Sequence, residues 1–201
     1  MDPRQIFAGV DIAIGRKPIT LAALDDDFGL VLLEKCDTSQ ALAHLTQYKE
    51  VMLAINTRSE KRGQRIYAGL KKKLAQAGFA PYLKKSALKQ WIEMNSRDCF
   101  HGLAGWSPLP PRTFEGRIQR ALILFEQGLR INDPMDFFEE ITRHHVLMGV
   151  FPKESLYSAA ELDALIAAYA AWATVRQPVL VDVSGNKLDG IMVVLKTRTE
   201  V

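Results

Sequence analysis

One acidic residue, Asp11, lies inside a stretch with the composition of a buried β-strand. The surrounding segment, IFAGVDIAI at residues 6–14, is rich in β-branched and aromatic side chains, which favour strands. A buried carboxylate is costly unless a backbone donor, a basic side chain or a divalent cation pairs with it. The first two partners are architectural. A cation held jointly with carboxylates from elsewhere in the chain would be a functional site.

A second acidic candidate, Asp163, lies in a segment that predicts a helix from Ser158 to about Thr174. Ser158 and Glu161 have the spacing of a capping box, in which each side chain satisfies a backbone amide of the other residue. Within this helix Asp163 belongs to a stripe of otherwise small side chains, which would let the helix approach a sheet closely. The alternative is an exposed Asp that the helix dipole stabilises near the N-terminus.

Basic residues are concentrated in one part of the chain. Residues 58–89 contain ten Lys and Arg residues against one acid, whereas residues 130–163 contain seven acids against three basic residues. A basic face is a candidate footprint for a polyanion such as nucleic acid, although a solvated lysine-rich helix has the same pattern. The candidate phosphate-binding residues are Arg58, Lys61, Arg62, Arg65, Arg112, Arg117 and Arg120. Arg117 and Arg120, in the predicted helix after the Pro-rich loop, could equally anchor that loop to an acidic helix.

The composition is that of a globular protein. The chain has 201 residues, of which 48% are apolar and 24% charged, and this predicts a single domain over residues 1–201. No stretch reaches the ~18 apolar residues of a membrane span, and the start of the chain has no signal-peptide core. The two cysteines match neither a disulfide framework nor a metal-ligand spacing. We therefore expect a cytoplasmic protein with no membrane partner.

Three strands at residues 6–14, 18–24 and 29–35 are predicted first, and their short polar connections predict an antiparallel meander. The stretch around Glu93 has no clear pattern. The further predicted elements are a helix at 39–49 with Thr38 or Ser39 as its N-cap, a strand at 51–55 covered on both faces, a helix at 60–77, a loop at 101–113, a helix at 115–127, a helix opened by Asp133 and Pro134, and a hairpin at 178–196. Residues from about 101 to 157 are thus expected to form a helical insertion before the last helix.

This order of elements resembles that of the ribonuclease H-like fold, and over roughly residues 6–196 the chain is similar to domain of unknown function family 429. The similarity is carried by AGVDIA at 8–13, AIN at 54–56, IEMNSRDCF at 92–100, TFEGRIQR at 113–120 and ELDALIAAYAAW at 161–172. That family is described as predicted ribonuclease H-like nucleases, with Holliday-junction resolvases and transposase-type enzymes as distant relatives. The resemblance implies an α/β fold whose mixed sheet joins an antiparallel meander of three strands to parallel strands, flanked by helices.

The resemblance also implies site residues. Asp11 matches the family's first-strand Asp, Glu93 the Glu of an EVYP-like motif, and Asp163 the Asp of the last helix. Asn56 stands where family members often have Asp in an IDAP-like motif, and the proline that follows the family's Glu is absent here. A neutral amide can offer an oxygen to a cation but brings no charge.

The function implied by the resemblance is metal-dependent cleavage of phosphodiester bonds in DNA or RNA. Two Mg²⁺ or Mn²⁺ ions about 4 Å apart can activate water and stabilise the leaving oxygen. Asp11, Glu93 and Asp163 would be the metal ligands, with Asn56 beside them in the catalytic site. The alternative, which Asn56 favours, is a catalytically silent ribonuclease H-fold protein that binds nucleic acid or acts as a scaffold. An ATP-dependent phosphotransferase is disfavoured, because the chain has no Gly-rich phosphate loop and no second copy of the domain.

Overall fold

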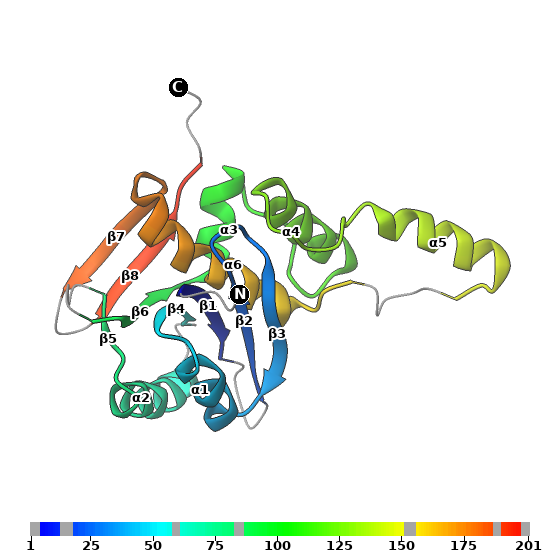
Figure 1. Cartoon of the computed structure of the whole chain (residues 1–201). Helices are drawn as coiled ribbons and strands as arrows, with labels where there is room; N and C mark the ends of the chain where they lie inside the picture. The colour runs from blue at the N-terminus through cyan, green and yellow to red at the C-terminus, as the bar shows by residue number, and fades with distance from the viewer. Residues whose placement is uncertain are drawn as a thin grey trace.

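The computed structural model describes residues 5–12, 18–57, 61–82, 87–150, 156–186 and 190–197. In this part of the chain an eight-stranded mixed sheet is flanked by six α-helices, so the protein has a mixed α/β fold (Figure 1). None of the helices in these ranges is long and apolar enough to cross a membrane.

The predicted meander is confirmed. Strands β1 (Gln5–Asp11), β2 (Ile19–Leu24) and β3 (Leu30–Cys36) pair antiparallel in sequence order. Strand β4 (Glu50–Asn56) then lies parallel to β1 on its other side, in the centre of the sheet. Its near-continuous apolar sequence suits this position, because both faces of a central parallel strand are covered.

The sheet continues beyond β4 with strands from later in the chain. The stretch around Glu93 is strand β6 (Lys89–Met94), which pairs parallel to β4 and has the short strand β5 (Ala80–Pro81) beside it. Strands β7 (Val181–Asn186) and β8 (Gly190–Leu195) pair antiparallel, as the hairpin prediction expected. The strand order is β3-β2-β1-β4-β6-β8-β7.

Helix α6 (Ala159–Arg176) covers one face of the sheet and is buried almost all round. The predicted capping box is present: the Ser158 hydroxyl accepts from Glu161 N, and the Glu161 carboxylate accepts from Ser158 N. The predicted close approach also holds at Gly9, where an added Cβ would lie 2.1 Å from the carbonyl oxygen of Ala164. Only a residue without a side chain fits under this helix.

The opposite face is covered by α1 (Thr38–Thr46) and α2 (Lys61–Gln76), whose apolar residues share a core cluster with that side of the central strands (Figure 1). The predicted N-cap of α1, Thr38 or Ser39, lies one or two residues after the observed cap. Asp37 is the cap, and it forms a capping box with Gln40. An Asp side chain accepts well from the first helical amides, which is why this position ends the preceding strand.

Helices α3 (Ser96–Ala104), α4 (Phe114–Glu126) and α5 (Asp136–Leu147) lie in sequence between β6 and α6. The prediction of a loop at 101–113 was wrong for residues 101–104, which finish α3 before the left-handed residue Gly105. The buried side chains Cys99, Phe100 and Leu103 hold this helix in place. Their spacing was hidden by the Gly and Pro residues that follow.

Helix α5 begins later than predicted and projects from the body (Figure 1). Asp133 and Pro134 lie in a turn before the helix rather than in its first turn, and Asp133 Oδ1 accepts from Met135 N at 2.8 Å. Phe137 is buried and packs on Phe114 of α4, with ring centroids 4.9 Å apart. This contact joins the arm to the body.

Candidate functional site

Asp11 and Asn56 are neighbours at the carboxyl ends of two central strands. They are register partners in the parallel pairing of β1 with β4, and both are 2% exposed or less. Asn56 Nδ2 donates to Asp11 Oδ1 at 2.8 Å. Both side chains lie on the face covered by α6, because they continue the alternation of Phe7 in β1 and of Ala54 in β4 toward that core.

The Asn56 amide also contacts the start of α3. Asn56 Oδ1 accepts from Ser96 N at 2.9 Å, and Asn56 Nδ2 lies 3.3 Å from Ser96 Oγ. Sequence analysis did not identify Ser96, which is buried. The available signal was Asn95-Ser96 directly after an apolar run, a typical helix start, and Asn95 is indeed the N-cap of α3. Asn56 therefore links β1, β4 and α3 through one amide group.

Asp163 lies at the same end of the sheet as Asp11. Helix α6 runs antiparallel to β1, because Arg176 at its end donates to the Gln5 side chain at the start of β1, at 2.9 Å, and Ala164 lies over Gly9. Asp163 is 2% exposed. This agrees with the predicted position of Asp163 on the sheet side of the helix.

The charge beside Asp163 belongs to Arg120 of α4. Burial lowers the pKa of the Arg120 guanidinium, and the Asp163 carboxylate acts in the opposite direction. Arg120 is only 4% exposed, so its charge needs a nearby anion. Asp163 thus lies close enough to the buried Arg120 guanidinium to supply part of its counter-charge.

Glu93 lies on the opposite face of the sheet. In the pairing of β4 with β6, Ile55 is the register partner of Glu93, and Asn56 is the partner of Met94. Side chains alternate along a strand, so Met94 shares a face with Asn56 and Glu93 does not. The structure therefore does not bring Glu93 to Asp11.

Residues of α2 surround the Glu93 carboxylate instead. Tyr67 Oη donates to Glu93 Oε1, and Lys71 Nζ lies 2.9 Å from the same oxygen. The Lys71 ammonium also lies 4.3 Å from the ring centroid of Tyr67 and 4.9 Å from that of Trp91. Burial raises the pKa of Tyr67, and the hydrogen bond to Glu93 adds to the effect. This is a half-buried ion pair that fastens α2 to β6.

Of the predicted phosphate-binding residues, two form contacts that are clearly architectural. Arg117 Nε donates to Tyr157 O at 2.7 Å, and its NH2 group donates to Leu156 O. Arg120 NH1 donates to Gly116 O at 3.1 Å and to Leu109 O. Arg120 thus contacts the Pro-rich loop at Leu109, whereas Arg117 contacts the segment before α6 and not that loop.

Of the other predicted phosphate-binding residues, the structure describes the side chain of Arg112. Arg112 is exposed in the turn before α4. Lys61, Arg62 and Arg65 belong to α2, but their side chains, like the whole of Arg58, lie outside the described residues.

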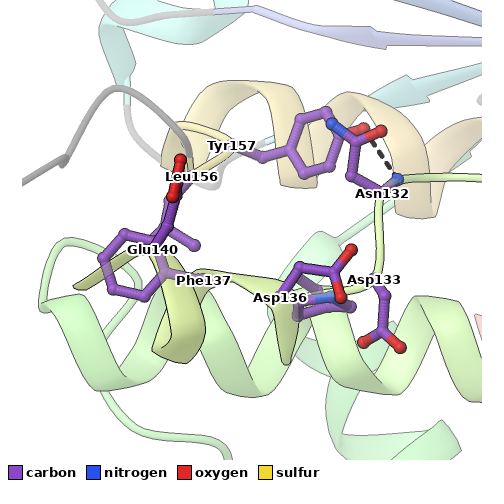
Figure 2. A pocket seen from close by; sticks show the side chains of 9 residues that line it. Asn132, Asp133, Asp136, Phe137, Glu140, Leu156 and Tyr157 are labelled. Atoms are coloured by element: carbon purple, nitrogen blue, oxygen red, sulfur yellow. Dashed lines mark hydrogen bonds between the residues drawn. The ribbon is translucent and has the colours of Figure 1, made fainter. Parts of the chain in front are cut away.

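A separate hollow with a volume of about 160 Å³ lies at the root of α5 (Figure 2). It contains none of the predicted site residues; its lining is Ala121, Asn132, Asp133, Pro134, Asp136, Phe137, Glu140, Leu156 and Tyr157. Its acids lie in and before the first turns of α5, where the helix dipole favours negative charge. The helix dipole accounts for these acidic residues, so their presence does not require a ligand.

The donor set does not fit a pair of metal ions. Among the described residues no group of three or more His, Cys, Asp and Glu side chains is placed to hold a metal ion. Asp11 and Asp163 share one end of the α6 face, Asn56 brings no charge, and Glu93 is on the other side of the sheet. A two-metal site needs three or four converging carboxylates.

No protein-family model matches this chain, and no curated protein sequence matches it.

Proposed function

We propose that this chain is a ribonuclease H-like protein that binds nucleic acid without cleaving it. The fold part of the proposal is supported by the antiparallel meander β1–β3, by β4 parallel to β1, and by a late helix packed on Gly9. These features agree with the element order from which the resemblance was drawn.

The observation that carries the absence of cleavage is the hydrogen bond from Asn56 to Asp11. Two carboxylates in this position would repel each other and would need cations between them. An amide donates to the carboxylate instead, and its oxygen is engaged by Ser96 N. The pair is therefore satisfied without metal, and the position that most needs a second negative charge is neutral.

The nucleic-acid part of the proposal is supported by α2. This helix carries six Lys and Arg residues and no acid, and Lys72 and Lys73 are exposed on it. Lys71 is partly engaged by Glu93. A helix of this charge raises the local concentration of a polyanion and contributes a salt-dependent binding free energy.

Fluorescence anisotropy with labelled single-stranded DNA, duplex DNA and RNA tests the binding. We expect the affinity to fall steeply with salt, and the double variant Lys72→Glu with Lys73→Glu to weaken binding at least tenfold. The matched control reverses Arg97 and Arg130 to Glu, which are exposed outside α2 and change the net charge equally. Equal losses in the two double variants, or no binding to any of the three probes, would contradict the proposal.

A second candidate function is cleavage with a single Mg²⁺ or Mn²⁺ ion. It is favoured by the burial of both Asp11 and Asp163 at one end of the α6–β1 contact, since these carboxylates are the residues that could hold such an ion. The ion would supply Lewis-acid stabilisation of the phosphodiester.

Calorimetric titration with Mn²⁺, with and without a non-hydrolysable oligonucleotide, separates the two candidates. We expect no binding that depends on Asp11, and no cleavage of the three probes. Mn²⁺ binding and cleavage that disappear in Asp11→Ala and in Asp163→Ala, but persist in Glu93→Ala on the other face, would establish the second candidate instead.

A further inference from the structure

Strand β7 forms one edge of the sheet (Figure 1). In the described part of the chain it pairs with β8 alone. Asp182, Val183 and Ser184 in its middle are exposed, and the apolar Val183 is 54% exposed. The edge of a sheet presents unpaired backbone N–H and C=O groups with which a strand from another chain can pair. The edge of β7 is therefore a candidate interaction surface.

The opposite edge of the sheet, at β3, is protected in two ways. Arg130 N donates to Phe28 O at 3.0 Å, and Arg130 forms a β-bridge with Gly29 just before β3. The second half of β3 also carries the charged residues Glu34 and Lys35. A covering segment and charged side chains both hinder pairing with another chain. At β7 no described residue forms a bridge of this kind.

The hydrogen bonds between β7 and β8 show which residues of β7 face outward. Lys196 N donates to Leu180 O at 2.8 Å, and these two residues continue the register of the hairpin. They are therefore a hydrogen-bonded pair, and in an antiparallel ladder such pairs alternate with non-hydrogen-bonded pairs. Because the register is constant along β7, Val181, Val183 and Gly185 direct their N–H and C=O groups away from β8.

The start of β7 agrees with this assignment. Val181 N–H donates to Pro178 O at the end of the short 3₁₀-helix η2 (Pro178–Leu180), so it does not donate to β8. Its carbonyl group faces the outer edge. On the same side, no described residue hydrogen-bonds to the backbone of Val183.

We propose that two copies of this chain join through β7, with the two strands antiparallel across a two-fold axis at Val183. Such an interface is isologous, so each contact occurs twice. Val183 then pairs with Val183 of the other copy through two hydrogen bonds. Val181 and Gly185 lie two positions to either side of the axis, so the Val181 carbonyl accepts from Gly185 N–H of the other copy. The two sheets become one continuous sheet.

The side chains favour this register and make the edge complementary to itself. With the axis at Val183, the two exposed Val183 side chains cover each other, and each Asp182 lies opposite a Ser184 hydroxyl that can donate to it. With the axis one residue earlier, two Asp182 carboxylates would be opposed, which is destabilising. With the axis one residue later, Val183 would face Gly185 and lose this cover. Within each copy, Lys196 Nζ lies 2.5 Å from Asp182 Oδ1 and compensates its charge.

Sedimentation velocity of the full chain, without nucleic acid and across a wide concentration range, tests the proposal. The shared strand has six residues and is about 20 Å long, so we expect a weak, reversible dimer. Val183→Lys opposes two ammonium groups at the axis and should weaken association at least tenfold.

The matched control is Val146→Lys, the same change at a valine of α5 that is 77% exposed, and it should leave association unchanged. Equal weakening in both variants would overturn the proposal. A monomer at all concentrations would also overturn it and would leave this edge to a strand from another protein.

Val183→Pro tests the hydrogen bonds separately, because it removes an N–H group that β8 does not use. Proline is tolerated on an edge strand where the N–H faces outward. Urea denaturation should therefore show a folded monomer of nearly unchanged stability, whereas sedimentation should show no dimer. Ser184→Pro removes an N–H that bonds to β8 and should destabilise the monomer. Equal destabilisation by the two prolines, or a dimer that survives Val183→Pro, would overturn the proposal.

Cross-linking tests the register. Under mild oxidation Val183→Cys should form a disulfide between two copies faster than Asp182→Cys or Ser184→Cys, because only residue 183 faces itself across the axis. The native Cys36 and Cys99 do not compete, because they are buried. Faster cross-linking of either neighbouring variant would overturn the proposed axis.

Discussion

On the face of the sheet covered by α6, Asp11 and Asp163 are almost fully buried and a neutral amide, Asn56, donates to the first of them. On the face covered by α2, Glu93 is partly exposed and is compensated by Lys71 and Tyr67. The difference follows from access to water. A lysine can place its ammonium near the half-buried Glu93 carboxylate at little desolvation cost, whereas the uncharged Asn56 amide donates to the fully buried Asp11 without bringing a second ion beside it.

The largest effect is expected for Gly9→Ala on the α6 face. The new Cβ would lie 2.1 Å from Ala164 O and 2.2 Å from Ala168 N, and these backbone atoms cannot move without displacing α6. We expect a loss of about 4 kcal/mol in the free energy of unfolding, measured by urea denaturation. The matched control is Gly69→Ala on α2, where no atom lies within 4 Å of the new Cβ. It should stabilise the helix by roughly 0.5–1 kcal/mol, and a destabilisation equal to that of Gly9→Ala would contradict the difference between the faces.

The next largest effect is expected for Asn56→Asp. The new carboxylate would face Asp11 Oδ1 at the present donor distance of 2.8 Å, and we expect a loss of about 3 kcal/mol at neutral pH. Millimolar Mn²⁺ should restore part of this loss, because two adjacent carboxylates favour a cation. Urea denaturation with and without Mn²⁺ measures both effects.

Asn95→Asp is the control for this substitution. Asn95 caps α3 by accepting from Arg97 N at 3.0 Å, and Asp serves equally well as an N-cap. If Asn56→Asp is as stable as Asn95→Asp without metal, the amide of Asn56 is not what satisfies Asp11.

The pH dependence of the free energy of unfolding compares the two faces, because each face has one buried cysteine. Burial raises the pKa of Cys36, in the α1–α2 core, to about 11, and that of Cys99, in the α6 core, to about 12. Each folded-state pKa lies above the unfolded value, so the associated stability is complete below about pH 9 and is lost as the pH rises. The expected slope is about −1.4 kcal/mol per pH unit for each thiol.

Urea denaturation at closely spaced pH values from 9 to 11 measures this slope in the wild type, in Cys36→Ala and in Cys99→Ala. Each variant lacks one thiol, so its free energy of unfolding should fall less steeply with pH by the amount that this thiol contributes. The cavity that the substitution leaves lowers the absolute stability and does not alter this comparison of slopes. Unchanged slopes in both variants would show that the thiols ionise equally in the folded and unfolded chains.

The smallest effect is expected for the ion pair on the α2 face. The Lys71 and Glu93 side chains are 30% and 13% exposed, so solvent screens their attraction. A double-mutant cycle with Glu93→Gln and Lys71→Met should give a coupling of about 1 kcal/mol. A coupling larger than the loss in Asn56→Asp would reverse the proposed ranking of the two faces.

Local patterns predicted most of the elements correctly. The short polar connections predicted the meander, and the spacing of Ser158 and Glu161 predicted the start of α6. Strand β6 was missed because Trp91, Ile92 and Met94 are apolar on both faces, so the alternation of a half-exposed strand is absent. The elements that were predicted correctly are those whose formation depends on residues close together in the sequence.

The candidate site was harder to predict. The burial of Asp11 and Asp163 followed from the apolar strand and from the small residues of the last helix. The face of Glu93 could not be predicted, because a difference of one residue along a strand moves a side chain to the other side of the sheet. Ser96 is distant in sequence from Asn56, and Arg120 from Asp163, and no local pattern predicts either contact.

The sequence by itself determined most of the strands and helices, the position of the main capping box, and the burial of Asp11. These properties follow from side-chain shape, polarity and periodicity. Only the tertiary structure decided that Asn56 donates to Asp11, that Asp163 lies near Arg120, and that Glu93 pairs with Lys71. The reason is physical: a carboxylate's partner depends on strand register and helix docking, which are set by packing of the whole domain.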